Sequence, residues 1–257
     1  MWEFLEENAM SKQLHAAKSC LNGVLSALLA ERGFTGATKI LEGKKGFYAA
    51  MTEDFDKEKC LKNIGSEFLF EQNSLKYYAS CGHTHSAIEA AIMAKKSEDL
   101  KIDEIENINV YVYQAAIDLL GNVIPTTSFL AKFSLPFCVA TAIKFVQAGL
   151  DDFCESRLVD PEIKNLMKRI TIISDNELSL QYPRKWPARV NITTTKGSRV
   201  SGAIDYPKGD PENPLTETEL TQKFLSLTKG IIVPLKANKL IERVMNLEKI
   251  KDIRELL

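Results

Sequence analysis

The chain has almost no net charge, because its 33 lysines and arginines are balanced by 34 aspartates and glutamates. This balance leaves no positive field to attract nucleic acid or an acidic membrane surface. The sequence also contains no run of about 20 apolar residues, the length that a membrane-spanning helix needs. Its opening residues, MWEFLEE, have the wrong charge for a signal peptide. We therefore expect a cytoplasmic protein that binds neither nucleic acid nor a membrane.

Cysteine is scarce as well, and the five cysteines are irregularly spaced with no CxxC pair. An odd number without regular spacing argues against a disulfide framework. Cys81, His83 and His85 alternate as Cys-x-His-x-His, which leaves a metal site as one interpretation. A structural zinc site needs four ligands with a recognisable spacing, and no second pair follows, so we expect no metal. Cys81 as a nucleophile also lacks an evident activating partner.

The three histidines fall in two short motifs, the first of which is SKQLH at residues 11–15. Apolar residues then recur at steps of three and four until Gly33, which predicts a helix from about Lys12 to Arg32. Lys12 and His15 project from one side of its first turn, where the helix dipole favours anions and tends to lower a histidine pKa. The alternative is a solvated surface lysine beside an ordinary half-buried histidine.

The second motif is KYYASCGHTH, residues 76–85, and it contains the other two histidines. Ser86-Ala-Ile-Glu89 follows as a capping box, which predicts a helix beginning at about Ser86. His83 and His85 would then lie just ahead of a helix N-terminus, a place that favours anions. This arrangement predicts a site for a polycarboxylate. A pair of histidines that only hydrogen-bond the loop is the structural alternative.

Three further residues of the motif complete the predicted site. Ser80 and the Gly82 backbone would form a concave loop rich in hydrogen-bond donors, and Lys76 is near enough along the chain to add a positive charge. We therefore predict that Lys12, Lys76, Ser80 and Gly82 bind substrate.

The pattern along the chain predicts an α+β fold with an interrupted helical domain. The pattern predicts helices over residues 1–65 and a smaller α+β domain with an antiparallel sheet over residues 66–210. Strand-like alternation occurs at 108–112, 170–172 and 190–192, and Lys196–Ser198 reads as a hairpin turn before a run at 199–205. The apolar segment 135–148 reads as a buried helix, with Ser134 as N-cap and Gly149 at its end. Residues 211–257 hold two helices, and Thr216–Glu219 forms a capping box before the first.

Several segments together resemble the MmgE/PrpD family, which includes 2-methylcitrate dehydratases, cis-aconitate decarboxylase and iminodisuccinate epimerase. They occur in the expected order over most of the chain, and they are Met10–His15, Leu28–Gly36, Ile40–Gly43, Ser80–Ile88, Lys132–Phe137 and Gly209–Leu215. The resemblance implies that the C-terminal helices return to pack on the helical domain, and no cofactor is expected.

The resemblance also implies roles for the motif residues. Lys12 and Lys76 match the family's two active-site lysines, and His15, His83 and His85 match its motif histidines. The shared chemistry is a carbanion or enediolate formed beside a carboxylate, which lysines stabilise while another group moves the proton. We expect a hydro-lyase of the 2-methylcitrate dehydratase type, with an epimerase or decarboxylase of the family as alternatives. A non-catalytic fragment that only binds carboxylates is a further alternative.

The resemblance departs from the family at the start of the chain, because Met1 aligns with a point where family members are already mid-chain. The principal general base would then lie outside this sequence, and we expect the chain alone to be inactive or weak. The helix at 12–32 is apolar on more than one side, so we also expect a large exposed apolar surface. A homodimer, or association with the missing N-terminal half, would cover it.

Overall fold

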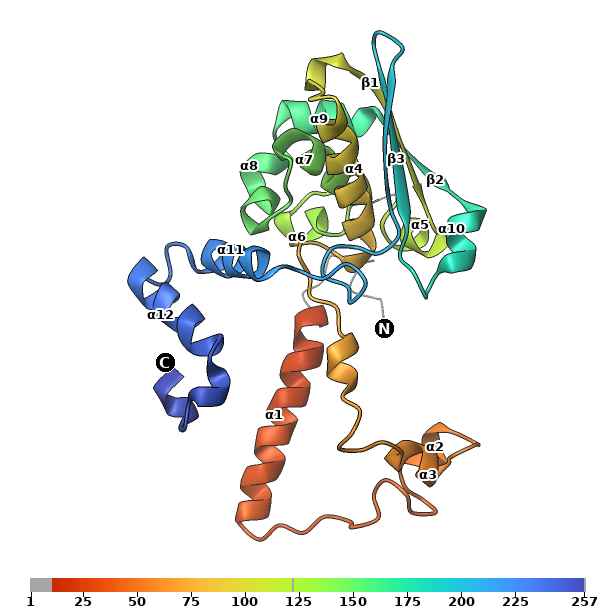
Figure 1. Ribbon diagram of the computed structural model, residues 1–257. Coiled ribbons are helices and arrows are strands. Elements are labelled where there is room, and N and C mark those ends of the chain that lie inside the picture. The colour runs from red at the N-terminus through yellow and green to blue at the C-terminus, as the bar shows by residue number, and fades with distance from the viewer. Residues whose placement is uncertain (1–10, 122, 257) are drawn as a thin grey trace. The chain divides into compact units, whose positions relative to one another are not determined.

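The computed structural model describes residues 11–121 and 123–256 (Figure 1). The chain divides into two compact units, the first ending at Phe70 and the second beginning at Glu71. The structure contains helices and a four-stranded mixed sheet, so the predicted α+β class is confirmed. The predicted boundaries at residues 65 and 210 stay predictions, and so does the packing of the C-terminal helices on the helical domain.

The first unit contains the helix α1, Ser11–Glu31, close to the predicted range. Gly33 ends α1 with a φ of +81°, and its N–H donates to the Ala30 carbonyl oxygen over 2.9 Å. The next helices are short, α2 at Phe47–Met51 and α3 at Lys57–Leu61, and turns occupy the segment between α1 and α2. The described part of this unit is therefore less helical than the sequence predicts.

The second unit is built on a sheet with the strand order β2-β1-β3-β4. The strands are β1 at Ile105–Val112, β2 at Ile170–Ser174, β3 at Ala188–Thr194 and β4 at Arg199–Ile204. The hairpin between β3 and β4 turns at Gly197, which has a φ of +81°, as predicted. β1 and β2 are parallel, so the prediction of an antiparallel sheet is wrong for this pair. The reason is the long helical crossover from β1 to β2, which brings the chain back in the same direction.

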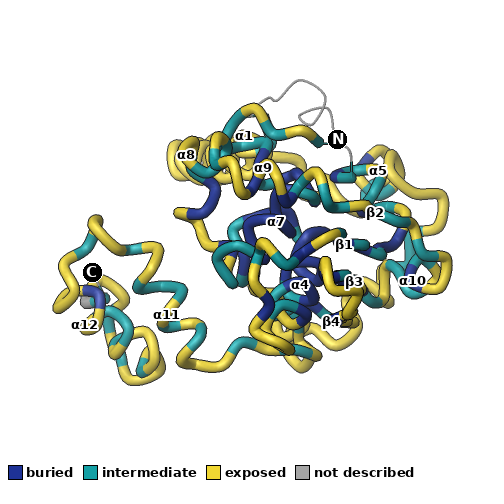
Figure 2. Tube along the Cα trace, turned by 90° about the horizontal axis from the view of Figure 1, so that it is seen from above, coloured by how far each residue is buried: buried dark blue, intermediate teal, exposed yellow. Residues whose placement is uncertain are grey.

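Two helices cover one face of this sheet: α4, His85–Ser97, and α7, Leu135–Phe145 (Figure 1). α4 packs directly on β3 and β4, while α7 packs on α4 and on α9, Pro161–Lys168. Figure 2 shows the buried residues concentrated along α4 and α7. At Gly202 of β4 an added Cβ would lie 2.1 Å from the Ala90 carbonyl oxygen, so only glycine permits this approach of helix and strand.

The buried helix predicted at 135–148 exists, but it ends earlier. The Ser134 hydroxyl accepts from the Phe137 N–H over 3.4 Å, which confirms the predicted N-cap. Val146 adopts a φ of +57° and closes α7 after Phe145. Gly149 instead donates its N–H to the Asp152 carboxylate and starts the next turn, so its predicted role as helix end is wrong.

The remaining helices are mostly short. α11 spans Glu217–Thr228 behind the predicted capping box of Thr216 and Glu219, which is confirmed, and α12 spans Pro234–Val244. The others are α5 at Gln114–Leu120, α6 at Ser128–Ala131, α8 at Glu155–Leu158 and α10 at Asn176–Gln181. Single 3₁₀ turns occur at Leu69–Gln72, Gly82–Thr84, Ile102–Glu104, Leu150–Phe153, Leu247–Lys249 and Ile253–Leu256. None of the described helices is long and apolar enough to cross a membrane.

Candidate active site

The segment that leads into α4 is held in place by backbone hydrogen bonds to distant parts of the second unit. The Leu75 N–H donates to the Gly209 carbonyl oxygen, the Ala79 N–H to that of Ala148, and the Cys81 N–H to that of Lys132, over 2.9, 3.0 and 2.8 Å. Residues 76–85 therefore lie on an irregular segment that these bonds tether, which continues into the 3₁₀ turn Gly82–Thr84 and the first residue of α4.

His83 lies in the 3₁₀ turn Gly82–Thr84 and is 8% exposed. Its Nδ1 is 2.6 Å from the Tyr113 hydroxyl oxygen, and its ring stacks on the Trp186 indole with centroids 4.4 Å apart. The Tyr113 ring in turn stacks on Tyr182 at 4.5 Å. The imidazole therefore contacts a phenol and an indole from remote parts of the sequence.

Gly82 permits this stacking, because a Cβ at this position would lie 3.1 Å from the Trp186 ring. A side chain here would push the indole away from the loop. The geometry gives Gly82 a steric role beside the substrate-binding role that the sequence predicts.

The capping box predicted at Ser86 is wrong. α4 begins one residue earlier with Thr84 as N-cap, and the Ser86 hydroxyl donates to the Trp186 carbonyl oxygen. The Glu89 carboxylate accepts from the Lys208 N–H over 2.9 Å instead of closing on the helix start. Both side chains bind parts of the chain about 100 residues away, which a local motif does not reveal.

The Ser80 hydroxyl is used within the loop. It lies 2.7 Å from the Thr84 hydroxyl, which itself donates to the Cys81 carbonyl oxygen over 2.8 Å. Since Thr84 uses its hydrogen on Cys81, Ser80 donates to Thr84. The predicted binding of substrate by Ser80 stays a prediction, and this geometry leaves lone pairs rather than a hydrogen for that purpose.

His85 is the first residue of α4 and is 3% exposed. Its pKa falls to about 4, chiefly because burial disfavours the charged ring and next because Lys76 carries a like charge. The Lys223 charge acts in the same direction, while hydrogen bonds from the ring to the backbone of Ser80 and Tyr78 oppose the shift. His85 is therefore neutral near pH 7.

The tautomer of His85 follows from its surroundings. Nε2 is buried and has no hydrogen-bond partner among the described residues, so the nitrogen that binds the backbone is Nδ1. Backbone carbonyl oxygens accept hydrogen bonds, and Nδ1 therefore bears the hydrogen. Nε2 is left with a lone pair inside the protein.

Two lysines lie at the beginning of the 76–85 loop, Lys76 as its first residue and Lys223 bound to it from α11. The Lys76 ammonium donates to the Ser80 carbonyl oxygen over 3.2 Å. Lys223, on α11, donates to the carbonyl oxygen of Lys76 itself. The loop thus combines two cations with the neutral imidazole of His85, an arrangement suited to an anionic ligand.

Lys12 and His15 lie in the first turn of α1, in the first unit. His15 is exposed and Lys12 is half-buried. Their predicted roles in catalysis and binding stay predictions.

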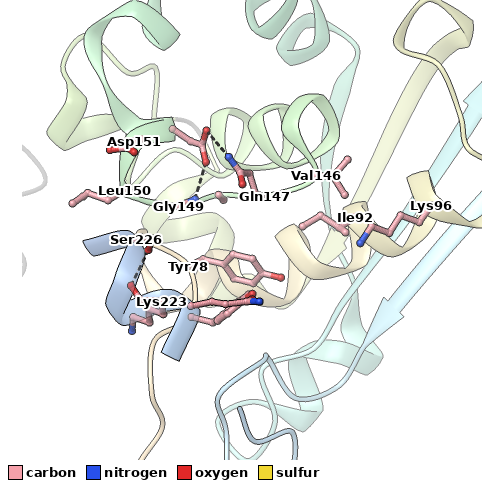
Figure 3. A pocket seen from close by; sticks show the side chains of 14 residues that line it. Tyr78, Ile92, Lys96, Val146, Gln147, Gly149, Leu150, Asp151, Lys223 and Ser226 are labelled. Atoms are coloured by element: carbon pink, nitrogen blue, oxygen red, sulfur yellow. Dashed lines mark hydrogen bonds between the residues drawn. The ribbon is translucent and has the colours of Figure 1, made fainter. Parts of the chain in front are cut away.

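A cavity of about 390 Å³ opens beside the loop (Figure 3). It lies among Tyr77 and Tyr78, α4, the turn after α7, and α11, and Lys223 is the one lysine that it shares with the loop described above. Its lining includes neither His83 nor His85. The cavity therefore borders the loop at Tyr77 and Tyr78 without reaching its histidines. In the described parts of the chain, no group of three or more His, Cys, Asp or Glu side chains is arranged to hold a metal ion.

Comparison with known protein families shows to which family this chain belongs. Residues 78–249 match the MmgE/PrpD C-terminal domain, and residues 1–59 match the MmgE/PrpD N-terminal domain. The chain belongs to the MmgE/PrpD family. The family predicted from the sequence motifs is thereby confirmed.

Relatives of this MmgE/PrpD chain bear names that refer to one reaction. The cis-aconitate decarboxylase-like protein oryM of Aspergillus oryzae is 23% identical over 96% of this chain and 54% of its own length. Cis-aconitate decarboxylase of Aspergillus terreus has the same identity and coverage. The human cis-aconitate decarboxylase is 22% identical over 94% of this chain and 51% of its own length. The chain spans about half the length of the curated relatives it matches.

The candidate site of this MmgE/PrpD chain contains residues that sequence reasoning missed. Tyr113, Trp186 and Lys223 contact the motif residues from 30 to 147 positions away. No periodicity or short motif links such positions to the 76–85 loop. Only the folded second unit brings them together.

Proposed function

We propose that this chain forms part of a lyase that acts on a small di- or tricarboxylate through a carbanion or enediolate beside a carboxylate. Membership of the MmgE/PrpD family supports this reaction class. The observation that carries the proposal is the 76–85 loop with Lys223 of α11 bound to it. Burial, together with the charges of Lys76 and Lys223, lowers the pKa of His85, which is therefore neutral. Cations beside a neutral imidazole provide charge stabilisation and proton transfer in one place.

The roles of the individual groups follow from their chemistry. Lys76 binds a substrate carboxylate as a compact point charge and stabilises the negative charge that develops in the transition state. His83 supplies or orients a proton, and the Nε2 lone pair of His85 accepts a hydrogen bond or a proton. Lys12 and His15 are assigned to carboxylate binding and proton transfer by their sequence motif alone.

Decarboxylation is the reaction favoured for this chain, because the relatives found are named cis-aconitate decarboxylases. Loss of carbon dioxide breaks a carbon–carbon bond and leaves an electron pair on carbon, which a proton donor then quenches. The dehydration of 2-methylcitrate expected from the sequence uses the same stabilised carbanion, and it stays a prediction.

Product analysis tests the proposal. The purified protein is incubated with cis-aconitate, 2-methylcitrate and an aminated dicarboxylate, and the products are identified by NMR. We expect carbon dioxide and a decarboxylated acid from cis-aconitate, even if slowly, and loss of that product in Lys76→Ala. Lys96→Ala, at a lysine of α4 that lines the neighbouring cavity and contacts none of the loop histidines in the described contacts, is the matched control. Binding without product would instead favour the non-catalytic alternative.

A further inference from the structure

Tyr113 lies at a point where the sheet meets the candidate site. It directly follows β1, precedes α5 as its N-cap, and is 2% exposed. Its hydroxyl oxygen is 2.6 Å from Nδ1 of His83, a residue 30 positions earlier. No motif predicts this contact, and the roles assigned to the site residues so far do not include Tyr113.

The direction of this hydrogen bond follows from the burial of the phenol. If Nδ1 of His83 donated to Tyr113, the phenol hydrogen would need another acceptor inside the protein. Among the described residues, His83 is the one hydrogen-bond partner found for the Tyr113 hydroxyl. Burial also raises the pKa of Tyr113, so the phenol keeps its hydrogen. The favoured arrangement has Tyr113 donating to Nδ1.

Both rings are also held against rotation. Trp186 stacks on the His83 ring at an interplanar angle of 12°, and Gly82 leaves room for the indole to do so. Tyr182 stacks on the Tyr113 ring at 11°. The hydrogen bond therefore joins two side chains whose ring planes are fixed by separate aromatic neighbours.

We infer that Tyr113 is a positioning residue for His83, which donates its phenol hydrogen to Nδ1 and thereby holds the imidazole in the tautomer that bears its hydrogen on Nε2. Nε2 of His83 then bears a hydrogen, whereas Nε2 of His85 bears a lone pair. The two histidines of the 76–85 loop hold opposite tautomers. The use of the His83 hydrogen to protonate a substrate carbanion rests on the proposed function.

Tautomer assignment by NMR tests this inference directly. The protein has three histidines, so the long-range nitrogen–proton correlations of each ring can be assigned by single replacements. In the wild type we expect His83 with its hydrogen on Nε2 and His85 with its hydrogen on Nδ1. His83 with its hydrogen on Nδ1 in the wild type would overturn the inference without any variant.

Two hydroxyl deletions complete the test. Tyr113→Phe keeps the ring stack but removes the donor, so the fixed Nε2–H tautomer of His83 is expected to be lost. Tyr182→Phe removes a hydroxyl from the same stack without touching this hydrogen bond, and the His83 spectrum is expected to stay unchanged. An unchanged His83 tautomer in Tyr113→Phe would contradict a positioning role.

The spectroscopic readout separates this inference from the proposed function. If Tyr113→Phe changes the tautomer and no carboxylate is turned over by the wild type, the assignment of Tyr113 stands and the proposed function fails. If turnover occurs, Tyr113→Phe is expected to lower kcat while KM stays unchanged, because the phenol orients His83 and does not bind substrate. Turnover with the same kcat and the same tautomer in Tyr113→Phe would overturn the inference alone.

Discussion

At the scale of single residues, the 76–85 loop holds two histidines in different surroundings. His83 is bound by a phenol and an indole, while His85 is buried near the charges of Lys76 and Lys223. Neighbouring titratable groups in different environments commonly take different roles in catalysis. Such a division fits the carboxylate chemistry that we propose for this loop.

His85 makes the stability of the protein depend on pH. Its pKa of about 4 in the folded state lies below the ordinary value of 6.5, so the unfolded chain binds the proton first. The contribution of the neutral His85 to the free energy of unfolding is fully present above about pH 6.5. This contribution, roughly 3 kcal/mol, is lost as the pH falls towards 4. We expect the free energy of unfolding, measured with urea, to fall over this range by that amount more in the wild type than in His85→Gln.

His15→Gln, at an exposed histidine of α1, is the matched control for this measurement. It is expected to keep the pH dependence of the wild type. An equal pH dependence in His85→Gln and the wild type would show that His85 is not held neutral by the fold.

At the scale of elements, the approach of α4 to β4 fixes the position of the histidines, because His85 is the first residue of that helix. Gly202→Ala would place a Cβ 2.1 Å from the Ala90 carbonyl oxygen, and a backbone atom has little freedom to move. We expect destabilisation of at least about 1–3 kcal/mol, the usual cost of overpacking a core, measured by urea unfolding.

The control for this change is Ser201→Ala, at an exposed neighbouring position of β4. It is expected to alter the free energy of unfolding by less than about 0.5 kcal/mol. Equal stability of the two variants would mean that helix and strand are not in close contact at Gly202.

The sequence predicted elements where the pattern is local. The strands, the hairpin at Gly197, the capping box at Thr216 and the N-cap at Ser134 all depend on neighbouring residues, and the structure confirms them. The capping box predicted at Ser86 failed because distant partners bind its residues. Ser86 and Glu89 have capping-box spacing, but Trp186 and Lys208 bind them instead.

The candidate site shows the same limit. Residues 76–85 could be selected from the sequence because their histidines, lysine and glycine stand together. Tyr113 and Lys223 could not, because a tyrosine after a strand and a lysine on an amphipathic helix have no local feature that marks them. Their roles arise only when the second unit folds.

At the scale of the whole molecule, α1 presents an apolar surface. None of its residues is buried, and Leu14, Leu21 and Val24 are 65%, 59% and 62% exposed. Exposed apolar faces of this kind drive association. We expect light scattering to show concentration-dependent association that Leu21→Glu weakens, while Lys18→Glu, a charge change on the same helix, has a smaller effect.

A monodisperse monomer at every concentration would contradict this expectation. The predicted homodimer, or association with a further helical segment, would then have no support from α1.

The central claim is that the 76–85 loop binds a carboxylate substrate through Lys76, and calorimetric titration with cis-aconitate tests it most directly. A charge-assisted contact contributes about 1.5–3 kcal/mol, so Lys76→Ala should bind about tenfold or more weakly with unchanged stability. Lys96→Ala should bind like the wild type. Equal affinity of Lys76→Ala and the wild type, or no binding by the wild type, would contradict the account.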